Sequence, residues 1–303
     1  MTTGNRSILR PVVITMLAVL SSACSRAEFA YRNADWLLEY YAWQTVSINE
    51  TQLEHWQPLL QSTLLRHREE ELPLVIAYLD LAGHTARKAD ATPGAACLVD
   101  AALLLYKRHA RLAVDLSAPL LANLDATQIR HLAGHMAQRH QDDVERYLNP
   151  DPELRKEARQ ERVLKRIENW TGGLNDDQRK RVRHALDRIP DLSPSWLTQR
   201  AQKTDALLAM LEAGANTDVL RDYLEDWWVH RDGASAETLR LWRIARDESI
   251  QLMDELATTL TSRQRTRIEG RLRDLRDNLA GFLPGRQQPA DLHAVPSCAA
   301  ASV

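Results

Sequence analysis

One short motif of apolar and polar positions occurs four times in this chain. The motif is an apolar residue, a capping residue, two spacers and a glutamine, and its copies lie at residues 48–52, 124–128, 174–178 and 260–264. Asn, Asp or Thr followed three residues later by Gln is typical of a capping box, in which each side chain bonds a free backbone N–H at a helix start. We therefore predict four helix starts, capped by Asn49, Asp125, Asn175 and Thr261.

The residues behind each motif repeat in phase. Eight and twelve residues after the apolar residue, every copy is apolar again, which produces the pairs Trp56/Leu60, Leu132/Met136, Val182/Leu186 and Ile268/Leu272. Residues four apart lie on one helical face. We expect this face of each helix to pack in the core. Because the four starts are far apart in the sequence, we also expect their contributions to stability to be additive.

Helical spacing continues through the rest of the chain. No stretch shows the sustained alternation of β-branched residues expected of strands, and glycine is scarce, with 11 in 303 residues. The pattern predicts an all-α, multi-helix bundle of about ten helices without a sheet, in mostly antiparallel hairpins. The helical domain is expected at residues 24–283, with a possible division near 149–152. Residues 284–303, which are rich in Pro, Ala and Ser, are predicted to be a disordered tail.

Residues 1–23 have the features of a secretion signal. Two arginines precede a short apolar run, and Ser21-Ser22-Ala23 then leads to Cys24. A cysteine at this point is typical of bacterial lipoproteins, where it is acylated and becomes the mature N-terminus, although Ser21 stands where leucine is usual. By resemblance to sorted lipoproteins, Ser25 implies the periplasmic face of the outer membrane. The alternatives are a cleaved signal with an incidental cysteine and an uncleaved anchor.

Charge and cysteine content narrow the classes of partner. Removal of residues 1–23 takes away two of the 39 basic residues and none of the 41 acidic ones, which leaves a formal charge of −4. This balance argues against a nucleic-acid partner and against a basic surface for anionic lipid, so the membrane is expected to be reached through the lipid on Cys24. Cys97 and Cys298 can pair in an oxidising periplasm; otherwise Cys97, in an apolar stretch, is interpreted as a buried and unreactive thiol. No nucleotide-binding motif is present, and no cofactor is expected.

Two pairs of residues have the spacing of a reactive site. His131 and His135 lie four apart, as two metal ligands on a helix do, but no glutamate lies between them, and we favour a solvated or packed histidine face. His67 and Glu71 are also four apart and offer acid and base groups. The charged residues around them are more typical of a solvated face with ion pairs. An enzyme is therefore not the favoured interpretation.

Aromatic residues indicate two candidate contact surfaces. Trp36, Tyr40 and Trp43 share one helical face close to the N-terminal cysteine. Such a stripe either packs in the core, which we favour, or lies at the bilayer interface, where Trp and Tyr are enriched. Trp227 and Trp228 are adjacent and cannot face the same way on an α-helix. We expect one of them to lie in the core and the other to cover a groove or contact a partner.

Several of these stretches resemble an uncharacterised family of helical lipoproteins of Gram-negative bacteria, a domain of unknown function. The resemblance covers about residues 24–283 and rests on Cys24-Ser25, 31–38, Asn49 with Gln52, 66–73, 174–178 and 196–200. It implies the location and the fold, and it carries no activity. Separately, the motif at residues 260–264 resembles the Leu-Thr-x-x-Gln motif of periplasmic stress chaperones, which are much smaller proteins with a concave apolar surface.

These patterns favour a non-enzymatic periplasmic protein, anchored in the outer membrane, that binds another protein or a component of the envelope. Chaperone-like binding of client proteins is the most specific form of this hypothesis. The alternative is an envelope enzyme that acts on peptidoglycan with a carboxylate such as Glu71. A deep cleft holding His67 and Glu71 would favour the enzyme, and a broad apolar concavity would favour the binding protein.

Overall fold

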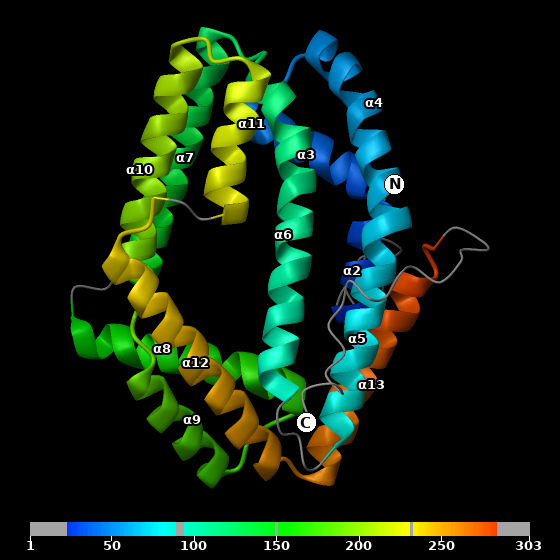
Figure 1. Ribbon diagram of the computed structural model, residues 1–303, viewed down its shortest axis with the longest axis vertical. Helices are drawn as coiled ribbons and strands as arrows, with labels where there is room; N and C mark the ends of the chain where they lie inside the picture. The colour runs from blue at the N-terminus through cyan, green and yellow to red at the C-terminus, as the bar shows by residue number, and fades with distance from the viewer. Residues whose placement is uncertain (1–22, 89–93, 149–150, 231–232, 284–303) are drawn as a thin grey trace, which may run out of the picture.

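The computed structural model describes residues 23–88, 94–148, 151–230 and 233–283 (Figure 1). The expectations for the signal before residue 23, for the tail at 284–303 and for Cys298 lie outside these residues. Of Cys24 only the backbone is described, at the start of a helix.

Every regular element among the described residues is a helix, and no strand occurs in them, which confirms the all-α prediction. The elements are α2 (Ala23–Arg32), α3 (Ala34–Val46), α4 (Glu50–Arg66), η1 (His67–Glu71), α5 (Leu72–Arg87), α6 (Gly94–Leu121), α7 (Ala126–Tyr147), α8 (Pro152–Thr171), α9 (Asp176–Arg188), α10 (Ser193–Glu212), α11 (Thr217–Glu225), η2 (Asp226–His230), α12 (Ala236–Thr259) and α13 (Ser262–Ala280). None of these helices combines the length and the apolar character needed to cross a membrane.

The helices that pack along one another are often far apart in the sequence. The long helix α6 runs through the middle of the molecule with α11 beside it, α5 lies along α13, and α7 lies along α10 (Figure 1). α8, α9 and α12 lie at the lower end of this view. The bundle is therefore closed by long-range helix pairs, in addition to the short connections between successive helices.

Two main clusters of buried side chains hold this arrangement together. The larger cluster joins α3, α4, α6, α7, α10 and α11, and it includes Trp56, Leu60 and Leu220. The smaller cluster joins α8, α9 and α12 around Val182. Five of the eight residues on the predicted helical faces are buried, and the other three are half-buried: Met136, Ile268 and Leu272.

All four predicted helix starts are capping boxes. In each box, a side-chain oxygen of the cap accepts the backbone N–H of the glutamine, and the glutamine Oε1 accepts the backbone N–H of the cap. These eight bonds are 2.9 to 3.2 Å long. The boxes open α4, α7, α9 and α13, with the caps Asn49, Asp125, Asn175 and Thr261.

The boxes are joined in pairs by their glutamines. The amide of Gln52 donates to Oε1 of Gln128 at 2.9 Å and its Oε1 accepts from the amide of Gln128 at 2.6 Å. Gln178 and Gln264 exchange the same two bonds, at 3.0 and 2.9 Å. The expectation of four independent helix starts is therefore wrong, because each glutamine bonds the box of another helix as well as its own.

The glutamine of each box makes one further hydrogen bond, and its acceptor occupies the same position in all four cases. Each glutamine Nε2 also donates to the backbone carbonyl that lies two residues before the cap of the partner box. These carbonyls belong to Asn123, Ser47, Thr259 and Gly173. The chain therefore contains one kind of helix junction twice, with α4 and α7 at the upper end of the view and with α9 and α13 at the lower end (Figure 1).

Cys97 lies near the start of α6, where it is half-buried and disulfide-bonded. The interpretation of this residue as a buried and unreactive free thiol is therefore wrong. The pairing with Cys298 that the sequence permits lies outside the described residues.

Candidate functional site

Four of the eight tryptophans of the chain line one pocket, which we call the tryptophan pocket. It has a volume of about 320 Å³ and lies among residues of α6, α10, η2 and α12. The lining residues are Tyr106, Leu192, Trp196, Gln199, Trp227, Trp228 and Trp242.

Trp227 and Trp228 both line this pocket, and the chain is π-helical at this point. η2 continues α11 directly. The wider turn of a π-helix rotates successive residues by less than the roughly 100° of an α-helix. The two indole rings have centroids 6.2 Å apart, and both pack, half-buried, against the larger core cluster. The expectation that the two rings face different ways, with one of them in the core, is therefore wrong, and contact of either ring with a partner stays a prediction.

Bonds from neighbouring helices hold this wall of the pocket in place. Tyr106 of α6 donates its hydroxyl to the backbone carbonyl of Trp228 at 2.8 Å. The ring of Tyr223 packs edge-on against Trp227, with centroids 6.1 Å apart, and its hydroxyl donates to the carbonyl of Lys203 at 2.6 Å. Val229, the next residue of η2, is fully buried. The two indoles are thus positioned before any ligand arrives.

Trp196 of α10 is held by side chains of its own helix and of α7. Cζ of Arg200 lies 4.4 Å from the centroid of the indole, a cation–π contact. Arg200 also donates to Asp143 of α7 at 2.7 Å, and Tyr147 of α7 packs edge-on against the indole at 6.3 Å. Although Trp196 is 39% exposed, its orientation is therefore restrained from two sides of the ring system.

The lining of the tryptophan pocket suits an apolar or aromatic group. None of its residues is Asp, Glu, Lys, Arg or His, and the polar groups are the indole N–H groups, the Tyr106 hydroxyl and the Gln199 amide. A phosphate or carboxylate would lose its hydration there without a charged partner. A sugar ring would find flat faces to stack on, but few partners for its hydroxyls. The volume is at the lower end of the roughly 300–1,000 Å³ typical of ligand pockets, and it suits one large side chain.

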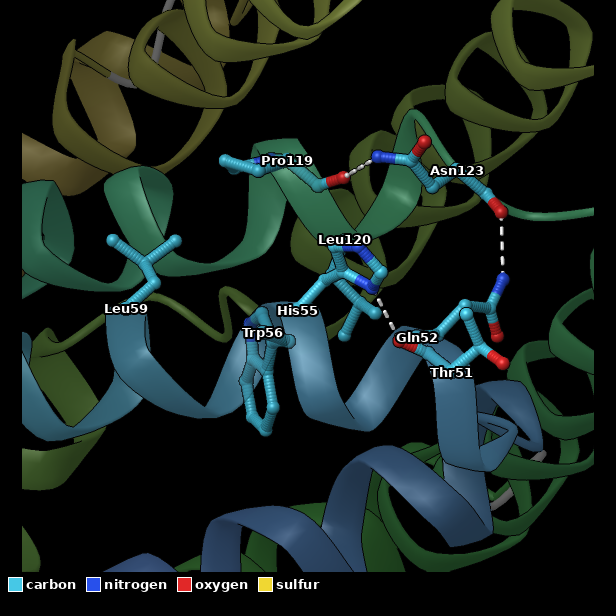
Figure 2. A pocket seen from close by; sticks show the side chains of 8 residues that line it. All are labelled: Thr51, Gln52, His55, Trp56, Leu59, Pro119, Leu120 and Asn123. Atoms are coloured by element: carbon cyan, nitrogen blue, oxygen red, sulfur yellow. Dashed lines mark hydrogen bonds between the residues drawn. The ribbon is translucent and has the colours of Figure 1, made fainter.

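A cavity of similar size belongs to the first pair of capping boxes. It measures about 330 Å³ and lies between α4 and the end of α6. Trp56 and Leu120 are among the side chains that line it (Figure 2). Its amide groups are already engaged. Gln52 bonds the partner box, and Asn123 donates its side-chain amide to the carbonyl of Pro119 at 2.8 Å. We interpret this cavity as a consequence of the helix junction.

A larger cavity, of about 430 Å³, lies among α5, α6, α8, α12 and α13. Its polar side chains also connect helix ends. Arg265 donates to the carbonyl of Lys88 at 2.8 Å and to the carbonyl of Ala257, and Asp254 accepts the backbone N–H of Ala95 at 3.3 Å. These bonds serve the packing of the helices, so this cavity is a weaker candidate than the tryptophan pocket.

The predicted acid–base pair lies in the other π-helical segment. η1 contains His67 and Glu71 and joins α4 to α5 without a break. Glu71 is buried, and its two carboxylate oxygens accept bonds from the guanidinium of Arg108 at 2.6 and 2.7 Å. A carboxylate occupied at both oxygens by one guanidinium is poorly placed to exchange a proton with a substrate.

His67 belongs to a chain of three hydrogen bonds. Nδ1 of His109 lies 2.7 Å from the carbonyl of Leu105 and therefore carries a proton. Nε2 of His109 then accepts from Nε2 of His67 at 3.1 Å, and Nδ1 of His67 accepts from the hydroxyl of Tyr31 at 3.1 Å. Burial, and next the proximity of His109, lower the pKa of His67 from 6.5 to about 4. At neutral pH both ring nitrogens of His67 are thus engaged within the protein.

The candidate metal ligands His131 and His135 lie on α7. Nε2 of His131 is 3.0 Å from the backbone carbonyl of Gln44, which links α7 to the end of α3. In the described part of the chain, no three His, Cys, Asp or Glu side chains are grouped so as to hold a metal ion. The prediction of a metal site at these two histidines thus rests on their spacing alone.

Sequence reasoning identified only Trp227 and Trp228 as candidate contact residues of the tryptophan pocket, and the three aromatic residues that it missed are Tyr106, Trp196 and Trp242. They lie on three different helices, and no local pattern connects them. The one available signal was compositional, because the chain has eight tryptophans and only two phenylalanines.

Comparison with known proteins identifies a family. A family model described as a family of unknown function (DUF6279) matches residues 44–229, and this region contains every lining residue of the tryptophan pocket except Trp242. No curated protein and no solved structure matches the chain. The resemblance to an uncharacterised family is confirmed, whereas lipid attachment and likeness to stress chaperones stay predictions. Because the match covers more than half of the chain, the protein belongs to the family of unknown function DUF6279.

Proposed function

We propose that this protein is a lipoprotein on the periplasmic face of the outer membrane that binds another protein and catalyses no reaction. The tryptophan pocket holds an aromatic or apolar side chain of that partner. The observation that carries the proposal is the gathering of four tryptophans around an uncharged pocket of about 320 Å³. The location is supported by the signal-like residues 1–23 and by Cys24, as argued from the sequence.

A pocket of this kind is suited to supply much of the free energy of a protein contact. Tryptophan is enriched among the residues whose truncation costs about 2 kcal/mol or more of binding free energy. Rings that are already held in place lose little conformational entropy when a partner binds. The rings of Trp196, under Arg200, and of Trp227, against Tyr223, are held in this way, and the hydrogen bond from Tyr106 fixes the backbone at Trp228.

The alternative function, an envelope enzyme acting on peptidoglycan, has less support. Glu71 and His67 are neighbours in η1, but their polar atoms are occupied by Arg108, Tyr31 and His109. The tryptophan pocket has neither a carboxylate nor an imidazole on its lining, so it offers no conventional general acid or base. Binding without catalysis is therefore the function that the geometry favours.

Crosslinking in intact cells tests the proposal. A photo-crosslinking amino acid in place of Gln199, on the pocket lining, should capture a protein, and Trp196→Ala in the same chain should abolish the capture. Trp170→Ala is the matched control. Trp170 is 38% exposed, close to the 39% of Trp196, and its ring also lies near a guanidinium, at 5.0 Å from Cζ of Arg271. Trp170 does not line the tryptophan pocket, so this control should leave the capture unchanged.

Two results would contradict the proposal. One is equal capture by the Trp196→Ala chain and its parent, and the other is equal loss of capture in both tryptophan variants. Capture of glycan strands in place of a protein would change the class of partner and return peptidoglycan to consideration. Melting temperatures of all variants show whether a lost crosslink reflects lost folding.

A further inference from the structure

The aromatic stripe of α3, which consists of Trp36, Tyr40 and Trp43, faces outward. Its three side chains are 57%, 48% and 60% exposed, so the expectation that they pack in the core is wrong. Another side of the helix, with Ala42 and Val46, packs in the larger core cluster instead. α3 is thus apolar toward the core and aromatic toward the outside.

The rings of the aromatic stripe form one continuous surface. Trp36 and Tyr40 are stacked, with centroids 5.8 Å apart and planes inclined by 17°, and the centroids of Tyr40 and Trp43 are 6.1 Å apart. At roughly 100° per residue, the stripe belongs to a helical sector of about 160° that extends from Trp43 to Tyr41. No charged residue of α3 falls in this sector, and its one uncharged polar residue besides the tyrosines is Gln44.

The two charged residues of α3 lie outside this sector, on the side of Trp43 that is away from Tyr41, and Glu39 borders the stripe. By the same rotation, Asp35 and Glu39 fall on the side of Ala42 and Val46. Glu39 accepts a hydrogen bond from the side-chain amide of Gln57 in α4 at 2.9 Å. The stripe itself thus carries no charge, although the outer face of an ordinary solvated helix does, and the carboxylate that borders the stripe is bonded by a side chain of α4.

We propose that the aromatic stripe lies on the surface of the lipid bilayer, among the headgroups. Trp and Tyr favour this zone because their rings are apolar while the indole N–H and the phenol O–H are polar. The inference rests on the lipid anchor proposed at Cys24, and it adds a second attachment that fixes how the helical bundle is oriented on the membrane.

The position of the stripe in the chain selects the membrane as its partner. Cys24 precedes Trp36 by twelve residues, and only Asn33 separates α2 from α3. At 1.5 Å per residue, a helical chain of this length spans about 18 Å. An acyl group on Cys24 therefore keeps the stripe close to the bilayer. Phe29, between the two, is also more than half exposed.

A chain that cannot be acylated separates the stripe from the anchor. The mature chain with Cys24→Ser should partition onto vesicles of phosphatidylethanolamine and phosphatidylglycerol. Adding Trp36→Ser and Trp43→Ser should lower the partition coefficient by more than about tenfold, because two large aromatic surfaces are lost. Adding Trp170→Ser and Leu154→Ser instead, at side chains 38% and 51% exposed, should leave it unchanged. A larger share of phosphatidylglycerol should have little effect, because the stripe carries no charge.

Two results would overturn the proposal. One is equal partitioning by the Trp36→Ser/Trp43→Ser chain and its parent. The other is a dimer in solution that this double variant abolishes, since a second copy would then cover the stripe. Circular dichroism verifies that both double variants are folded. If the mature protein carries no acyl group but partitioning depends on the stripe, the proposed anchor fails and the role of the stripe stands. If the mature protein is acylated but partitioning does not depend on the stripe, the anchor stands and the role of the stripe fails.

Discussion

Gln178 and Gln264 bond each other through both polar atoms of their side chains, with the Nε2 of each donating to the Oε1 of the other at 3.0 and 2.9 Å. Both side chains are buried. Each Oε1 also accepts the backbone N–H of its own cap, and each Nε2 also donates to a backbone carbonyl. All the hydrogen-bonding capacity of the two amides is therefore used inside one helix junction.

This relationship predicts strong coupling between the two glutamines. Gln178→Ala or Gln264→Ala alone should lower the free energy of unfolding by about 1–3 kcal/mol, because each leaves the other amide buried without its partner. The double variant should cost clearly less than the sum of the single variants. Denaturant unfolding measures both. A cross-pair control, Gln178→Ala with Gln52→Ala, should be additive, and additivity within the Gln178–Gln264 pair would contradict the prediction.

The contribution of each helix cap to stability should increase with the number of backbone N–H groups that its side chain accepts. Asp125→Ala and Thr261→Ala should each cost about 0.5–2 kcal/mol, with the larger loss at Asp125. Asp125 accepts two backbone N–H groups, at 2.7 and 2.9 Å, whereas Thr261 accepts one, at 3.2 Å. Asp125→Asn should be nearly neutral because it keeps an acceptor oxygen. Urea unfolding provides the comparison, and an equal loss for Asp125→Asn and Asp125→Ala would indicate a role other than capping.

Stability should fall in mild acid because of His67. The pKa of this residue is about 4 in the folded protein and 6.5 in the reference state, so between these values the unfolded chain binds more protons. Stability therefore decreases as the pH falls from 6.5 toward 4. His67→Gln should flatten this part of the profile measured by thermal melting. His131→Gln, at an exposed histidine outside the bonded chain, should keep the profile, and an unchanged profile for His67→Gln would contradict the assignment.

The ion pair of Glu71 and Arg108 should contribute more to the free energy of unfolding than the surface ion pairs do. Arg108→Met leaves a buried carboxylate without its partner, and we expect a loss of about 3 kcal/mol in the free energy of unfolding. Adding Glu71→Leu should recover much of this loss. The exposed pair of Arg66 and Asp115, 2.9 Å apart, is the control, and Arg66→Met should cost at most about 1 kcal/mol. Similar losses for Arg108→Met and Arg66→Met would argue against the importance of burial.

The proposed lipid anchor predicts a covalent modification of Cys24. Mass spectrometry of the mature protein should find an N-terminal cysteine that carries acyl groups. Cys24→Ala should abolish the modification and lower the share of the protein in the membrane fraction, because the aromatic stripe is then its only attachment. An unmodified mature N-terminus in the wild-type protein would remove the argument for the outer-membrane location, while the tryptophan pocket would still be testable.

Local sequence patterns are sufficient to show where these four helices begin and which residues share a helical face. A capping box is closed by atoms that lie within four residues of one another, so Asn49 with Gln52 identifies a helix start without knowledge of the fold. In the same way, spacing by four residues places Trp56 and Leu60 on one face, and both are buried.

The residues that pack against these local features can be read from the folded chain alone. Gln178 and Gln52 have the same local motif, and nothing near them in the sequence specifies that the first meets Gln264 and the second Gln128. Periodicity shows that Trp36 and its neighbours in the stripe share a face of α3, but the small residues of the opposite face pack in the core, and this depends on the helices that surround them. The tryptophan pocket is likewise assembled from separate helices. The physical reason is that capping is a local interaction, whereas burial is a property of the whole packed chain.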